Sequence, residues 1–302
     1  MTIITPLPDE LPGQTGFLTS YEQQKLWEAA LLVTESRGFM IRLTSLFGRQ
    51  VENVQTIISG AGERIIGSSW SKLEQKIQNS VEDTLWHSYN YATFGLEAMP
   101  DFIRPKQPRK NRLHKALTAA SGMISGFVGL PGVVVDIPFT TAVILRSIAE
   151  IARDFGEDLN SEETKRACLE VLAFGEPAEM SDKQDSQTEA GYWAARLGTS
   201  HLTVNLLIRS ASGRFGLILS EKIMAQTVPL AGAVAGGLLN YSFTDYYQSM
   251  AKVHFCLRAL ERRTGNPEGV KQSFIAMLDL ARERKKLGRY RRRLPPVLLP
   301  KN

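Results

Sequence analysis

The chain has 302 residues, 43% of them hydrophobic, and a formal net charge of +5. That length can bury a sizeable core in one or two domains. The charge is concentrated at one end: residues 281–302 hold nine basic residues and one acidic residue, which leaves about −3 for the remainder. This distribution excludes a general nucleic-acid-binding surface, and no base-reading motif accompanies the charge, so we expect no nucleic-acid partner.

The beginning of the chain is predicted to be a flexible lead over residues 1–18, because prolines and glycines recur there. It has neither the basic region nor the apolar core of a secretory signal. A helical domain over 19–287 and a basic tail over 288–302 are expected to follow. Ser20 and Gln23 fit a capping box, which predicts a helix through about Ser36.

A longer helix is predicted over about residues 68–96, where apolar residues recur at helical spacing. Its aromatic residues are predicted to form a stripe that packs in the protein core, or alternatively to lie at a lipid interface. They are Trp70, Trp86, Tyr89, Tyr91 and Phe94.

A basic linker broken by prolines is predicted over residues 100–115. Two interpretations stay open, a solvated connector and an anchor to anionic phospholipid, since a basic residue near such a surface contributes about 1 kcal/mol. The candidate lipid-binding residues here are Arg104, Lys106, Arg109, Lys110, Arg112 and Lys115. Those of the tail are Arg289, Arg291, Arg292 and Arg293.

Two uncharged runs, Ala116–Val135 and Ile223–Thr244, share small residues and an internal proline, Pro131 or Pro229. Glycines three or four residues apart let another helix approach closely, and such contact must offset about 1 kcal/mol per interior glycine. The candidates for close packing are Gly122, Gly126, Gly129, Gly132, Gly232 and Gly236. The runs are interpreted as a buried helical pair, or as segments that enter or lie on a membrane.

A helix is predicted over Phe139–Phe155, with Asp136 and Pro138 at its start and Gly156 at its end. Arg146 lies in its apolar stripe, so we expect it to be buried and paired with Glu150, Asp136 or Asp245. A structural ion pair is the favoured interpretation of these residues. Asp136, Arg146 and Asp245 are also the weak candidates for a catalytic site.

Further helices are predicted over about residues 161–173, 191–210, 242–264 and 267–287, with a polar loop over 175–190. Cys168 and Cys256 lie singly in apolar helical patterns, which predicts reduced thiols and a cytoplasmic setting.

No motif for a metal, a cofactor or nucleophilic catalysis is recognised. The histidines are scattered singly, at His87, His114, His201 and His254. A metal site of His254 with Asp245 or Glu261 is less favoured than a satisfied histidine. We therefore expect no metal and no cofactor.

Three stretches carry a resemblance to a known family. They are YEQQKLWEAALL (residues 21–32), GFVGLPGVVVDIPFTTAVILRSIAEIARDFGED (126–158) and PLAGAVAGGLLNYSFTDYYQSMAKVHFCLRALERRTG (229–265). Over about Tyr21–Gly265 the chain resembles the EcsC protein family, which is named for a bacterial protein encoded beside an ABC transporter. The resemblance implies a bacterial, largely helical protein without an established activity.

Together these observations predict an all-α, multi-helix bundle in which the two Gly/Pro-broken segments pack together. The functional hypothesis is a non-enzymatic protein that associates peripherally with the inner membrane through anionic phospholipid. The resemblance adds a transporter or secretion link. Alternatives are a hydrolase with a site near Asp136, Arg146 and Asp245, and a soluble helical scaffold.

Overall fold

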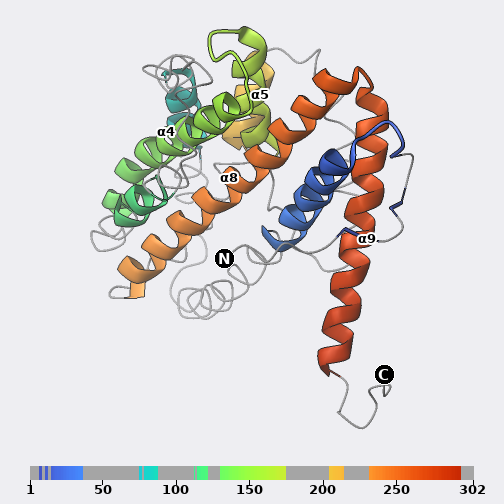
Figure 1. Cartoon of the computed structure of the whole chain (residues 1–302). Helices are drawn as coiled ribbons and strands as arrows, with labels where there is room; N and C mark the ends of the chain where they lie inside the picture. Colours follow the sequence, from blue (N-terminus) through green and yellow to red (C-terminus); the bar gives the residue numbers. More distant parts are fainter. Residues whose placement is uncertain are drawn as a thin grey trace. The chain divides into compact units, whose positions relative to one another are not determined.

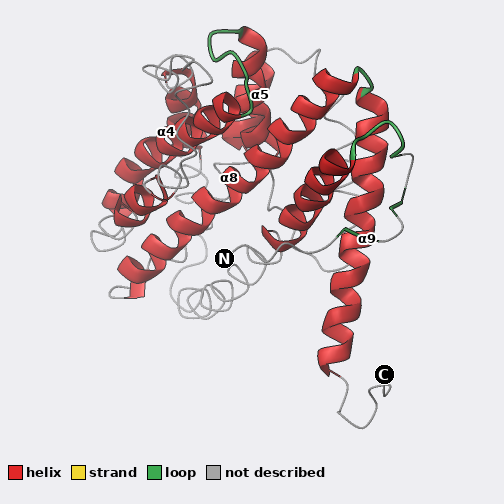
Figure 2. Ribbon diagram, in the orientation of Figure 1, coloured by secondary structure: helices red, strands yellow, loops and turns green. Residues whose placement is uncertain are grey.

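The computed structural model describes residues 7–8, 11–12, 15–36, 75–76, 78–87, 112, 114–121, 130–174, 204–213 and 231–293 (Figure 1). Within these ranges every regular element is a helix and no strand occurs (Figure 2), which confirms the all-α prediction. Four helices carry labels in Figure 1: α4 (Leu130–Asp154), α5 (Glu162–Phe174), α8 (Ala231–Thr264) and α9 (Pro267–Arg293). Shorter helical segments cover 20–36, 75–76 with 78–87, 114–121 and 204–213.

The chain divides into two compact units. Unit 1 comprises Met1–Ser36, Ser181–Ser200 and Val253–Asn302. Unit 2 comprises Arg37–Met180 and His201–Lys252. Helix α8 therefore contributes its first part to unit 2 and its last part to unit 1.

In unit 1 the 20–36 helix begins with a capping box one residue earlier than predicted. Thr19 precedes the helix, and its backbone N–H donates to Glu22 Oε2 at 2.9 Å while Thr19 Oγ1 accepts from the Glu22 N–H at 3.4 Å. The predicted pair, Ser20 and Gln23, is wrong because Ser20 is already helical and Gln23 instead donates to the Thr15 and Leu18 carbonyls. The Glu22 carboxylate also forms an ion pair with Arg263.

Helix α9 of unit 1 follows α8 through a two-residue connection. Gly265 adopts a φ of +63°, a left-handed conformation that ends a helix at little cost for glycine. Asn266 then caps α9, because its Oδ1 accepts the Gly269 N–H at 3.0 Å. The helix ends at Arg293 rather than near residue 287, since the next prolines are Pro295 and Pro296. Its first three turns bury Val270, Phe274 and Met277.

In unit 2, α4 begins at Leu130, nine residues before the predicted start at Phe139. Pro131 therefore sits in the first turn, where its missing N–H leaves no hydrogen bond unmade. Pro138 lies inside the helix. Asp136 is consequently an interior helical residue, and the prediction that it precedes the first turn is wrong.

The core of unit 2 includes the contact of α4 with α5. Ile144, Ile148 and Ile151 are spaced at three and four residues and are buried, and so are Leu169 and Leu172 of α5. Gly156, with a φ of +80°, ends α4 as predicted. Ser161 caps α5 by accepting the Thr164 N–H at 3.1 Å, which confirms the predicted start of this helix.

The helix predicted over about residues 242–264 is the last part of a longer helix, which also includes part of the second uncharged run. Helix α8 is continuous from Ala231 to Thr264, so it begins just after Pro229 and includes Asp245 without a break. Of the proposed packing glycines, Gly132, Gly232 and Gly236 lie in the backbone of α4 or α8, and Gly122, Gly126 and Gly129 lie outside the described residues. Close packing at these glycines stays a prediction.

Candidate functional site

Three helical segments of unit 2, residues 114–121, α4 and α8, are joined by hydrogen bonds between buried polar side chains. Asn240 of α8 donates its Nδ2 to the Thr118 carbonyl at 2.9 Å and to Thr140 Oγ1 of α4 at 3.3 Å. Thr118 Oγ1 lies 2.8 Å from Thr244 Oγ1. All four side chains are buried, so the contacts satisfy groups that would otherwise be costly to bury.

These contacts join the two uncharged runs, because Thr118 belongs to the first and Asn240 and Thr244 belong to the second. The runs therefore meet as predicted, but the contacts that the structure describes are a hydroxyl pair and an amide. A polar residue inside an otherwise apolar helical run was the sequence signal for this layer, since such a residue needs a partner when buried.

Next to this layer, Lys115 forms an ion pair with Asp245, and its ammonium group lies 5.5 Å from the centre of the Tyr241 ring. The side chain of Lys115 is 13% exposed and that of Asp245 is 37% exposed. Lys252 lies within electrostatic range of both charges. Burial lowers the pKa of Lys252 from its ordinary value of 10.5, the positive charge of Lys115 lowers it further, and Asp245 opposes the shift.

A second charged group forms where the 114–121 helix meets the later part of α4. His114 Nε2 lies 3.0 Å from Glu150 Oε2, and both side chains are buried. Arg146 Nε lies 3.7 Å from the other oxygen of Glu150, which confirms the predicted local partner. The expected burial of Arg146 is wrong, because its side chain is 41% exposed.

The His114–Glu150 pair resembles the orientation of a general base by a carboxylate, but catalysis needs further groups. Within the described ranges, His114 Nδ1 has no hydrogen-bond partner. Arg146 contacts Glu150, and Asp245 contacts Lys115. Each of these two catalytic candidates forms an ion pair, and a catalytic role for them stays a prediction. For Asp136 the structure describes the backbone alone.

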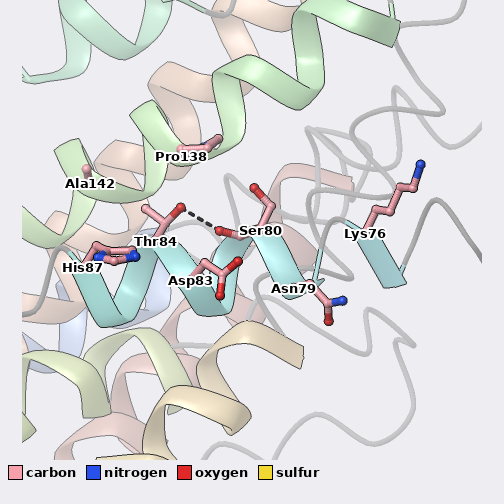
Figure 3. Close-up of a pocket in the computed structure, with 8 residues that line it drawn as sticks. All are labelled: Lys76, Asn79, Ser80, Asp83, Thr84, His87, Pro138 and Ala142. Atoms are coloured by element: carbon pink, nitrogen blue, oxygen red, sulfur yellow. Dashed lines mark hydrogen bonds between the residues drawn. The ribbon is translucent and has the colours of Figure 1, made fainter.

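A groove of about 620 Å³ lies between the 75–87 segment and α4 (Figure 3). One helix face supplies most of its polar groups: Lys76, Asn79, Ser80, Asp83, Thr84 and His87. Pro138 and Ala142 of α4 supply the apolar side. Thr84 Oγ1 donates to the Ser80 carbonyl at 2.6 Å, so this hydroxyl is used within its own helix. Trp86 on the same segment is 41% exposed, which contradicts a fully buried aromatic stripe.

The structure separates the candidate lipid-binding residues into distinct environments. Lys115 is helical and engaged with Asp245, whereas Arg112 is helical and exposed. Arg289, Arg291, Arg292 and Arg293 all lie in the last turns of α9. Arg104, Lys106, Arg109 and Lys110 lie outside the described residues, as do the polar loop 175–190 and the aromatic residues Trp70, Tyr89, Tyr91 and Phe94.

The described part of the chain lacks a metal-binding cluster and a helix long and apolar enough to cross a membrane. It contains no group of three or more His, Cys, Asp or Glu side chains placed to hold a metal ion. None of its helices combines the length and the hydropathy required to cross a membrane. Cys168 and Cys256 are both free thiols.

The family model of the EcsC protein family matches residues 25–260 of the chain. Searches of curated proteins and of solved structures returned no match.

Proposed function

We propose that this chain, which belongs to the EcsC protein family, associates peripherally with an anionic membrane surface through the basic end of α9. The observation that supports the proposal is the charge of this helix: residues 282–293 include eight basic residues and one acidic residue, Glu283. Because the helix continues through Arg293, these twelve residues occupy about 18 Å of one rigid element.

Two basic residues of α9 contact the 20–36 helix of unit 1: Arg284 lies 5.4 Å from the Trp27 ring, and Lys285 donates to the Thr34 carbonyl. Arg282 pairs with Asp279 of α9 itself at 3.1 Å. The four arginines at 289 and 291–293 follow on the last turns. In this proposal Arg284 and Lys285 attach the helix to unit 1, and these four arginines bind lipid headgroups.

The preference for a membrane over nucleic acid comes from the rest of the chain. Outside residues 281–302 the net charge is about −3, and no base-reading motif accompanies the basic segment. A short basic segment beside an anionic bilayer gains about 1 kcal/mol per basic residue, so a few arginines are sufficient. By family resemblance, the membrane is the inner membrane of a bacterium and the partner is a transporter.

Flotation of the full-length protein with vesicles tests the proposal. We expect binding to anionic vesicles at low salt and not to neutral ones. The R291Q/R292Q/R293Q variant loses about 3 kcal/mol, and its partition coefficient falls about 100-fold. At 1 M salt the wild-type protein is released too, because the Debye length falls to about 3 Å.

A matched control removes the same number of charges elsewhere. Lys76, Arg209 and Arg262 are exposed, and K76Q/R209Q/R262Q lowers the net charge by the same three units. The control variant keeps its binding if α9 is the attachment site. Equal losses in both variants, binding to neutral vesicles, or tighter binding to RNA than to anionic vesicles would contradict the proposal.

A further inference from the structure

The helical segment of residues 114–121, here called the latch segment, buries polar groups in unit 2 and little apolar surface. The two residues of the segment that are buried, His114 and Thr118, are both polar. Its one large apolar side chain, Leu117, is 43% exposed, and none of its three alanines is buried. Apolar burial, which contributes most to helix packing in globular proteins, is therefore small for this segment.

The latch segment is instead joined to α4 and α8 by hydrogen bonds and ion pairs. Water can replace the protein partner in each of these contacts when the segment is released. The net stabilisation from each contact is therefore much smaller than its strength in the protein interior. The contacts are His114–Glu150, Lys115–Asp245, Asn240–Thr118 and Thr118–Thr244.

Helix α5 of the same unit is packed in the opposite way. Its buried apolar residues are Ala167, Cys168, Leu169, Val171, Leu172 and Ala173. Release of α5 would expose this surface to water, at a cost that grows with the apolar area. The latch segment has far less apolar area to expose, so it should leave its place in unit 2 more readily than α5 does.

We propose that the latch segment is a conformational device, which leaves α4 and α8 reversibly while both of these helices stay folded. In the released state α4 keeps its contact with α5, and α8 remains one continuous helix. Water then reaches the buried polar partners of the segment, Glu150, Asn240 and Thr244. This opening takes place within unit 2 and does not depend on the attachment of α9 to a membrane.

Hydrogen exchange followed by mass spectrometry tests the proposal in the full-length wild-type protein. Most helical stability in proteins comes from tertiary packing, so the amide hydrogens of the latch segment exchange while the segment is released. We expect their protection factors to be at least about tenfold lower than those of α5. Equal protection of the latch segment and α5 would overturn the proposal.

A variant identifies the contact that closes the latch segment. Asp245→Asn removes the charge that pairs with Lys115, and it should lower the protection of the latch segment about fivefold further while α5 keeps its protection. The matched control is Asp279→Asn, which removes the same charge from an ion pair with Arg282 on α9. This control should change the protection of the latch segment by less than about twofold.

The same measurements separate a local opening from unfolding of the whole unit. If Asp245→Asn lowers the protection of α5 and of the latch segment by the same factor, the segment opens only when unit 2 unfolds, and the proposal is wrong. A loss of protection in the Asp279→Asn variant as large as that in Asp245→Asn would likewise overturn it, because the effect would then not come from the Lys115 contact.

Discussion

Removing one hydroxyl of the Thr118–Thr244 pair is expected to destabilise the protein, and removing both should cost little more. Thr118 Oγ1 lies 3.0 Å from the His114 carbonyl and 2.8 Å from Thr244 Oγ1, which in turn lies 2.8 Å from the Asn240 carbonyl. The two hydroxyl groups have one proton each. One hydroxyl therefore donates to the other, and the second hydroxyl donates to a backbone carbonyl. Both side chains are fully buried.

The magnitude follows from this arrangement. Thr118→Val or Thr244→Val loses the shared bond and leaves a buried oxygen with one partner fewer, at a cost of about 1–2 kcal/mol. The double variant loses the shared bond only once and replaces two facing hydroxyls by methyl groups. Its cost should fall below the sum of the single costs by about 1 kcal/mol.

Urea unfolding followed by circular dichroism gives the free energies of unfolding for this double-mutant cycle, with the m-value as a check that the unfolding transition is unchanged. Thr34→Val is the control, because the Thr34 hydroxyl donates only to the Ala30 carbonyl of its own helix and should cost less than about 0.5 kcal/mol. Additive costs for Thr118 and Thr244, within about 0.3 kcal/mol, would show that the two hydroxyls do not share a bond.

Two further predictions concern single positions. Lys252→Gln should raise the free energy of unfolding at pH 7 in chloride buffer, since it removes a half-buried cation whose pKa is lowered. Because Lys252 releases its proton at a lower pH in the native state than in the unfolded chain, the stability of the wild-type protein should rise as the pH approaches 10.5. The difference in free energy of unfolding between the variant and the wild-type protein should therefore shrink. Urea titrations at several pH values test this, and a variant that is less stable than the wild-type protein at pH 7 would contradict it. Gly265→Ala should cost about 1–2 kcal/mol because of the positive φ alone, since nothing lies within 4 Å of an added Cβ. Gly213→Ala, also in open space but without a positive φ, should not be destabilised in thermal unfolding, and equal shifts in the two melting temperatures would refute the argument.

Local signals predicted the elements whose boundaries are set by local chemistry. Ser161 before two glutamates marked the start of α5, and Gly156 marked the end of α4. The same kind of signal was misassigned at Thr19, because two adjacent residues could each begin a capping box and only the backbone decides between them.

In unit 2, proline predicted the start of a helix incorrectly. Pro138 predicted a helix start, yet α4 passes through it. A proline in a helix interior forfeits one hydrogen bond, and packing of the rest of the helix can outweigh that loss. Burial of the residues after Pro138, such as Ile144 and Ile148, supplies that packing, and it is not visible from the residues around the proline.

The candidate site could be predicted only in part, because its contacts join distant residues. Glu150 was identified as a partner of Arg146 because they are four residues apart. The Lys115–Asp245 pair joins residues 130 apart, and no local pattern connects them. Lys115 was therefore grouped with its basic neighbours as a lipid anchor, although the structure engages it within unit 2.

The polar layer of unit 2 also has a consequence for the order in which the protein can fold on the ribosome. Thr118 and its partner Thr244 are 126 residues apart, so at about 5–20 residues per second the second hydroxyl is synthesised roughly 6 to 25 s after the first. During that interval the 114–121 segment cannot reach its final burial, because Thr118 and Lys115 have no α8 to face. Completion of unit 2 is therefore a late event in synthesis, because the hydroxyl of Thr118 and the ammonium group of Lys115 gain their α8 partners only after α8 has been made.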